Sequence, residues 1–240
     1  MKQSMSASDI RAVARGKLLG KYRMLSGYVM LVLLIEFFIS NLIYSITLSN
    51  IWMILLAEMI GSILINIFVV GFIRICMKVV REESIAVDDL FYVVKHDPDK
   101  IVVISFISWF LRILIQLTTI LDIASNGAIV FNTVTQLGIM AVMAVVYVYG
   151  YILLSQCYFI YFDYPEYGAA EILQLSISMM KNNKLRFFGL LISIFGMFIM
   201  VILTLGIGVF WILPYMHVSM IIFYEDLKGE QNGHHFEVEG

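Results

Sequence analysis

Long runs of apolar residues recur along the whole chain, and no other feature restricts its fold as strongly. A run of about 18 or more apolar residues is long enough to cross the hydrocarbon core of a bilayer as a helix. Barrel strands would alternate apolar and polar residues, and these runs do not, so helices are the structure that satisfies their backbone groups in lipid. Only 14% of the residues are charged, against about 25% in soluble domains. The sequence therefore predicts an all-α, polytopic membrane protein.

We predict six transmembrane helices of about 20 residues each. They cover roughly residues 24–47, 51–74, 101–121, 137–161, 186–205 and 207–225. The last two share one apolar run that must turn once, and Gly206 and Gly208 mark the turn because glycine readily adopts positive φ. Pro214 then lies inside the last span as a helix break, where neighbouring helices can satisfy the carbonyl that it frees.

The basic residues are distributed asymmetrically along this predicted threading. Fifteen of the sixteen Lys and Arg residues lie before the first span, between the second and third, between the fourth and fifth, or after the sixth. The connections on the other side, at 48–50, 122–136 and around 206, contain none. Because basic connections stay in the cytoplasm, both termini are expected there, with the protein in the cytoplasmic (inner) membrane.

A short polar or amphipathic segment precedes each pair of spans, at about residues 6–22, 85–96 and 169–182. In the second segment the spacing of Val87, Leu90, Phe91 and Val94 predicts a helix lying on the inner membrane surface. The pattern of one segment and one hairpin, met three times, suggests three parallel repeats, as in some transporters. The alternative is that any cytoplasmic connection is basic and amphipathic. We expect one six-span membrane domain, residues 1–229, and a polar cytoplasmic tail, residues 230–240.

Three charged residues fall inside the predicted spans, and we group them with two amides as a candidate intramembrane polar cluster: Glu36, Glu58, Asn66, Arg112 and Gln116. Polar residues recur around them at helical spacing, so we expect a polar face on each of the first three spans and expect these faces to meet. The faces consist of Glu36, Ser40 and Tyr44 on the first span, Glu58, Ser62 and Asn66 on the second, and Ser105, Ser108, Arg112, Gln116 and Thr119 on the third. At about 1.5 Å per residue, Glu36 and Arg112 both lie near mid-bilayer, whereas Glu58 lies nearer the outer surface. We therefore expect Glu36 to pair with Arg112, with Glu58 as the second candidate. Such a cluster either holds helices together as a buried ion pair or forms a polar cavity for an ion, a proton or a lipid head group.

Other chemistry is sparse in the sequence. There is no catalytic constellation, no phosphate-binding glycine loop, no cofactor-binding motif and no metal-ligand spacing, so we expect neither an enzyme nor a cofactor. His217 is expected to be an interhelical hydrogen-bond partner. The expected partners are the lipid bilayer, anionic lipid head groups or another membrane protein, and not nucleic acid.

Three stretches together resemble a bacterial family of polytopic membrane proteins, domain of unknown function 975. They are "IRAVARGKLLG" (10–20), "GFIRICMKVVREESIAVDDLF" (71–91) and the long C-terminal stretch from Ser176 to Leu227, with "TLGIG", "PY" and "FY" in that order. The resemblance implies an integral protein of the cytoplasmic membrane and brings no reaction, ligand or catalytic residue with it.

Two functions remain open from the sequence. The first is a non-enzymatic membrane component or interaction partner in the cell envelope. The second is a small transporter or lipid-handling protein that uses the region of Glu36, Glu58 and Arg112. A path that reaches Arg112 would favour the second function, and a dry, fully paired cluster would favour the first.

Overall fold

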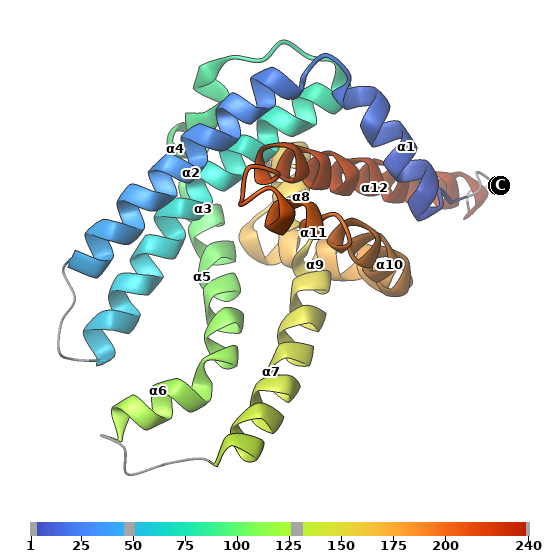
Figure 1. Ribbon diagram of the computed structural model, residues 1–240. Helices are drawn as coiled ribbons and strands as arrows, with labels where there is room; N and C mark the ends of the chain where they lie inside the picture. The colour runs from blue at the N-terminus through green and yellow to red at the C-terminus, as the bar shows by residue number, and fades with distance from the viewer. Residues whose placement is uncertain (1–3, 46–50, 126–131, 239–240) are drawn as a thin grey trace.

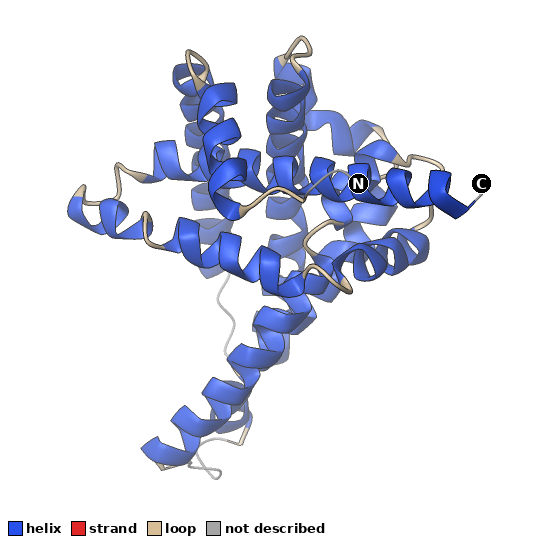
Figure 2. Ribbon diagram, turned by 90° about the vertical axis from the view of Figure 1, so that its right-hand side faces the viewer, coloured by secondary structure: helices blue, strands red, loops and turns tan. Residues whose placement is uncertain are grey.

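Three helical hairpins, each preceded by a short helical segment, follow one another along the chain (Figure 1). The computed structural model describes residues 4–45, 51–125 and 132–238. Within these residues every regular element is a helix and none is a strand (Figure 2). The first hairpin comprises the short helix α1 (Ala7–Leu18) and the long helices α2 (Tyr22–Ser45) and α3 (Ile51–Arg81).

The second and third hairpins have interrupted helices. The elements of the second are η1 (Val87–Phe91), α4 (Tyr92–Lys95), α5 (Pro98–Ile115), α6 (Leu117–Ala124), α7 (Thr133–Leu154) and α8 (Cys157–Asp163). Those of the third are α9 (Ala169–Met180), α10 (Lys184–Phe195), α11 (Phe198–Leu203) and α12 (Val209–Val238). We refer to α2, α5 and α10 as the outgoing helices and to α3, α7 with α8, and α12 as the return helices.

Four helical stretches are long and apolar enough to cross a membrane, which is fewer than the six that the sequence predicts. They are Tyr22–Ile43, Ile51–Arg81, Thr133–Asp163 and Lys184–Leu203. The predicted third span, 101–121, is not one helix, because α5 ends at Ile115 and α6 leaves its line at Gln116 (Figure 1). The predicted sixth span lies in α12, which continues as a helix through Val238, so its backbone shows no boundary between a membrane domain and a tail at residue 230.

The short helix α1 shows how local sequence signals and packing agree. The Ser6 side chain accepts a hydrogen bond from the Asp9 N–H, and the Asp9 carboxylate accepts one from the Ser6 N–H, which forms a capping box. Ile10, Ala14 and Leu18, spaced by four residues, are at most 1% exposed. This spacing places them on one face of the helix, which packs against α12.

The second short segment differs from the prediction of one amphipathic α-helix over 85–96. It begins as a 3-10 helix, η1, in which the side-chain period changes from 3.6 to 3 residues. Leu90 is buried, whereas Val87 and Val94, expected on the same apolar face, are 62% and 56% exposed. The backbone of η1 lies so close to α3 that a Cβ on Gly71 would lie 2.1 Å from the Leu90 carbonyl oxygen.

A buried carboxylate fastens η1 to α3. Asp89 accepts hydrogen bonds from Arg74 (3.2 Å), Lys78 (2.8 Å) and the Ala86 N–H (2.9 Å). Burial raises the pKa of this carboxyl, but the hydrogen bonds from Lys78, Ala86 and Arg74 together outweigh burial and lower the pKa below its ordinary value. The Arg74 guanidinium also stacks on the Tyr92 ring of α4, 3.5 Å from the ring centroid.

The three hairpins pack in a ring. Each short segment contacts the return helix of the preceding hairpin: η1 lies on α3, α9 on α7 and α8, and α1 on α12, which closes the circle (Figure 1). Each return helix also contacts the outgoing helix of the next hairpin, α3 with α5, α7 with α10, and α12 with α2. This cyclic order is what three repeats about one axis would produce; the equivalence of their backbones stays a prediction.

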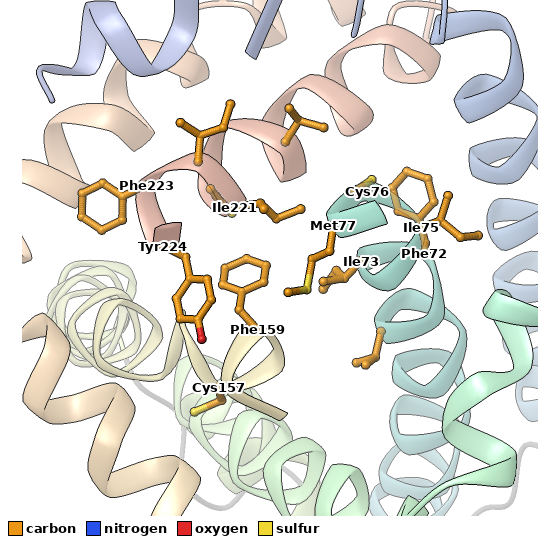
Figure 3. Packing of buried hydrophobic residues seen from close by; sticks show 14 of the residues in the cluster. Phe72, Ile73, Ile75, Cys76, Met77, Cys157, Phe159, Ile221, Phe223 and Tyr224 are labelled. Atoms are coloured by element: carbon orange, nitrogen blue, oxygen red, sulfur yellow. The ribbon is translucent and has the colours of Figure 1, made fainter. Parts of the chain in front are cut away.

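The best-packed part of the molecule lies where the return helices meet. Figure 3 shows Met77 of α3, Phe159 of α8 and Tyr224 of α12 pointing toward one another. The Phe159 and Tyr224 rings lie 5.3 Å apart, and both side chains are at most 2% exposed. The aromatic segment 158–167 thus contributes Phe159, Ile160 and Tyr161 to this core.

Candidate functional site

A cavity of about 340 Å³ lies between the three hairpins. Its walls come from α2, α3, α5, α7, α8 and α12, so side chains distant in sequence face one space. Its apolar lining residues are Ile65, Val69, Ile73, Leu111, Leu154, Phe159 and Met220. Its polar lining residues are Glu36, Ser62, Asn66, Ser108, Trp109, Arg112, Tyr147, Tyr151, Ser155, Tyr158 and His217. Ligand sites in proteins combine these features, a largely apolar hollow of at least about 300 Å³ with a few converging polar groups.

Three of the five predicted cluster residues line this central cavity. Glu36 of α2, Asn66 of α3 and Arg112 of α5 face it, as the helical spacing of polar residues on these helices suggests. Glu58 does not line it, because it lies two turns from Asn66, toward the beginning of α3. Gln116 does not line it either, because it is the capping residue at which α5 ends.

The predicted ion pair between Glu36 and Arg112 does not form. Among the residues that the structure describes, no basic group lies within 4.0 Å of the Glu36 carboxylate, and no acidic group within 4.0 Å of the Arg112 guanidinium. The pair was predicted because both residues lie at the same depth along their helices. Equal depth does not determine the distance between the two helices. The two opposite charges therefore share a cavity without neutralising each other.

Aromatic side chains that the sequence reasoning missed supply much of the polar lining. Tyr147 and Tyr151 of α7 are spaced by four residues and therefore lie on one face of the helix, and Tyr158 of α8 joins them in the cavity wall. Trp109 lies beside Arg112 in the wall, and no hydrogen-bond partner for its buried indole N–H is found within the described part of the chain. The four-residue spacing of Tyr147 and Tyr151 was the one feature of the sequence that could have indicated this part of the cavity wall.

His217 reaches the cavity from α12. Its Nδ1 donates a hydrogen bond to the Leu213 carbonyl oxygen of the same helix (2.8 Å), and its ring meets Phe72 of α3 edge to face. The predicted interhelical hydrogen bond is therefore replaced by a bond within α12 and a ring contact with α3. The three serines of the wall behave alike, because Ser62, Ser108 and Ser155 each donate to a carbonyl of the preceding turn.

The three return helices close one end of the cavity. Ile73 of α3, Phe159 of α8 and Met220 of α12 each line it and are at most 5% exposed. Along each helix the cavity lining ends at these residues, and the packed core of Figure 3 begins. The cavity is therefore bounded at this end by contacts between all three hairpins.

Beyond this core the same helices carry a set of charged and polar side chains, the ionic cluster, formed by Arg81, Asp163, Tyr224, Glu225 and Lys228. Arg81 donates two parallel hydrogen bonds to the Asp163 carboxylate, at 2.7 and 2.9 Å, and two to the Glu225 carboxylate, at 2.9 and 2.5 Å. Lys228 and the Tyr224 hydroxyl both donate to Asp163, at 2.6 and 3.0 Å. This bidentate pairing is the strong geometry for arginine and carboxylate, and here it joins the ends of α3 and α8 to the middle of α12.

The sequence contained little to identify the ionic cluster. Asp163 stands alone among aromatic residues, and Glu225 and Lys228 resemble an ordinary solvated helix end. Arg81 was counted only as one of many basic residues in a connection. Their common position, on the return helices beyond the packed core, becomes informative only when the three hairpins are compared with one another.

The predicted hairpin turn lies at residues 204–208. Leu205 and Gly206 both have positive φ, 51° and 94°, and Thr204 accepts a hydrogen bond from the Gly208 N–H through its hydroxyl (2.7 Å). Gly208 is closely packed, since a Cβ there would lie 3.1 Å from Val201 Cα. Pro214 lies inside α12, one turn and a half after its start.

No group of three or more His, Cys, Asp or Glu side chains that could hold a metal ion occurs among residues 4–45, 51–125 and 132–238.

Comparison with known proteins identifies a family to which the sequence is similar. Residues 1–231 match the family model described as "Protein of unknown function (DUF975)". No curated protein and no solved structure matches the chain.

Proposed function

Since the chain belongs to the family of unknown function DUF975, we propose its function from the central cavity: a multi-pass membrane protein that binds a small polar or amphiphilic ligand there, for transport or lipid handling. The proposal rests on one observation, that Glu36 and Arg112 line the same cavity and are not paired with each other. Charges within a membrane protein are expensive, and those that no protein group neutralises usually serve a ligand, an ion or a proton path.

An enzymatic role is not part of the proposal. The wall serines donate their hydroxyl protons to carbonyls of their own helices and not to a general base. His217 likewise uses Nδ1 within α12. A nucleophile and a base in contact are the first requirement for covalent catalysis.

The proposed topology is six crossings of the cytoplasmic membrane with both termini in the cytoplasm. Four helical stretches have the length and hydropathy of spans. The other two crossings would be α5, whose 18 residues extend about 27 Å, and the first half of α12. The positions of the fifteen basic residues support this orientation, which places the ionic cluster on the cytoplasmic side.

Two single cysteines test the orientation. Leu205 in the last turn is 94% exposed, and the Lys95 side chain at the end of α4 is 53% exposed. In intact cells a membrane-impermeant maleimide should label Leu205→Cys and not Lys95→Cys, and in opened membranes it should label both. The native Cys76 and Cys157 are buried and provide the background. Labelling of Lys95→Cys alone in intact cells would reverse the orientation.

Thiol accessibility also tests the cavity. In detergent-solubilised protein, Asn66→Cys should react with small charged methanethiosulfonates, because Asn66 lines the cavity. The matched control is Ile75→Cys on the same helix, which is fully buried in the core and should not react. Equal reactivity of the two cysteines, or none at Asn66→Cys, would contradict a ligand-accessible cavity.

The second candidate function, an interaction partner in the cell envelope, is favoured by a different observation. Val87 and Val94 expose apolar side chains beside the buried Leu90 on the segment that precedes the second hairpin. Such a face can bind the membrane surface or another membrane protein. Charged replacements, Val87→Glu with Val94→Glu, should leave Asn66→Cys labelling unchanged and abolish co-purification of any partner that uses this face.

A further inference from the structure

We propose that the central cavity holds the headgroup of a zwitterionic phospholipid, with its phosphate at Arg112 and its ammonium group at Glu36. This inference rests on the proposed function and names the class of ligand. It begins from the arrangement of charge: one cationic and one anionic side chain face the same space and are not in contact.

A ligand that carries both charges fits this arrangement better than one that carries a single charge. A purely anionic ligand would satisfy Arg112 and leave the Glu36 carboxylate unpaired. A simple cation would satisfy Glu36 and leave Arg112 unpaired. Both side chains are exposed at the edge of the cavity, and in the proposed topology this edge lies within the membrane, where an uncompensated charge is costly. A zwitterion whose charges are several ångströms apart is the ligand that leaves neither charge unpaired.

The two side chains also match the two groups of such a headgroup. The arginine guanidinium is a planar donor that binds phosphate oxygens in pairs, and it cannot lose its charge. A carboxylate offers only acceptors, which suits the three N–H donors of an ammonium group. Asn66 of the same wall supplies both a donor and an acceptor beside them.

The remaining wall suits the boundary between a headgroup and acyl chains. Tyr147, Tyr151 and Tyr158 combine apolar rings with hydroxyl groups, the character that places tyrosine at the headgroup level of membranes. The volume of about 340 Å³ suits a headgroup better than a whole two-chain lipid. Outside the cavity, Phe37 of α2 is 60% exposed and Phe110 of α5 is 53% exposed, so both helices offer apolar surface to acyl chains.

The test is lipid binding to the purified, delipidated full-length protein, measured by native mass spectrometry with phosphatidylethanolamine and phosphatidylglycerol at equal concentration. Wild-type protein should prefer phosphatidylethanolamine. Arg112→Gln should weaken the binding of both lipids at least about tenfold, as expected for loss of a charged hydrogen bond. Glu36→Gln should weaken phosphatidylethanolamine by a similar factor and leave phosphatidylglycerol unchanged or tighter.

Glu58→Gln is the matched control, because it removes a carboxylate from the same group of predicted spans without touching the cavity. It should leave both affinities unchanged. A preference for phosphatidylglycerol that Glu36→Gln does not alter would overturn the zwitterionic assignment. Labelling of Asn66→Cys would in that case still support a ligand-accessible cavity. Insensitivity of both lipids to Arg112→Gln would overturn the placement of the headgroup altogether.

A soluble zwitterion has the same headgroup chemistry, so free phosphoethanolamine forms a second arm. If the lipid is the ligand, phosphatidylethanolamine should protect Asn66→Cys from the thiol reagent, and phosphoethanolamine at the same concentration should not. Equal protection by both would support the pairing of charges and overturn the assignment to a lipid. Thermal unfolding of each variant separates lost binding from lost folding.

Discussion

Arg81 and Arg112 lie in two regions of the molecule that differ in how charged side chains are paired. Arg81 is held by Asp163 and Glu225 from two other helices. Arg112 faces a cavity with Glu36 in the same wall, and the two do not meet. The first arrangement joins the three hairpins, and the second contributes nothing to holding them. Whether an arginine of this protein stabilises the fold or is free to bind a ligand therefore depends on the acidic groups that contact it.

The largest effect should follow from removing the carboxylate that the ionic cluster shares. Asp163→Asn leaves Lys228 without its main partner and Arg81 with Glu225 as its remaining acidic partner, and hydrogen bonds to a charged group contribute up to about 3 kcal/mol. We expect a loss of this size in the free energy of unfolding, measured by chemical denaturation in detergent. Glu36→Gln, an equally conservative change in the cavity, is the control; equal losses for both variants would remove the distinction between the two regions.

Glycine substitutions should show the same contrast at a smaller scale. In Gly71→Ala the new methyl group would collide with the Leu90 backbone of η1, so we expect a loss of about 1–3 kcal/mol, typical of overpacking. In Gly150→Ala it would meet only the Leu111 side chain, which borders the cavity and has room to move. The midpoints of thermal unfolding should fall clearly for the first variant and little for the second. A larger fall for Gly150→Ala would show that the cavity half is the tightly packed one.

Acid should weaken the packed region through Asp89. Its pKa is lower in the folded protein than in the unfolded chain, so its contribution is complete above about pH 4, the unfolded value, and is lost as the pH falls through the folded value. The contribution should be about 1.5 kcal/mol, the low end for hydrogen bonds to a charged group. Urea unfolding from pH 7 to pH 3 should show this loss for the wild type. In Asp89→Asn that part of the pH dependence should disappear, and an unchanged profile would mean that the contacts with Arg74 and Lys78 do not stabilise the fold.

The smallest effect on stability is expected for the two charges of the cavity. Arg112→Gln and Glu36→Gln should each change the free energy of unfolding by less than about 0.5 kcal/mol, as for substitutions that break no contact. Unfolding of the delipidated protein is the proper measurement, since bound lipid would add its own stabilisation. A loss above about 2 kcal/mol in both would indicate that the side chains pair after all.

Helical periodicity was a good guide to the walls of the cavity and a poor guide to its chemistry. The spacing on α2, α3 and α5 placed Glu36, Asn66 and Arg112 toward a common space, because a polar face of a membrane helix avoids lipid. It failed at Gln116, since a helix end is decided by capping that an apolar run does not reveal. It also predicted an ion pair, because depth along two helices says nothing of the distance between them.

The ionic cluster could not be predicted from the sequence, for a different reason. Asp163, Arg81 and Glu225 come from three hairpins, and only the packing of the return helices brings them together. The turn at Gly206 lay at the other extreme, because a long apolar run offered few places to reverse and the backbone there adopts positive φ. Local features with one physical solution were predictable, and features that depend on the ring of hairpins were not.

The closure of that ring imposes an order on biosynthesis. Met5 donates its backbone N–H to Asp226, 221 residues further along the chain, and Arg186 binds both the Met5 carbonyl oxygen and Asp226. Until the ribosome has synthesised α12, the apolar face of α1, with Ile10, Ala14 and Leu18, lacks the helix against which it mainly packs. In the proposed topology, this amphipathic helix would bind to the membrane surface during that interval. A chain halted before α12 would leave that face without its main partner, so α1 is made about two hundred residues before it can be fully packed.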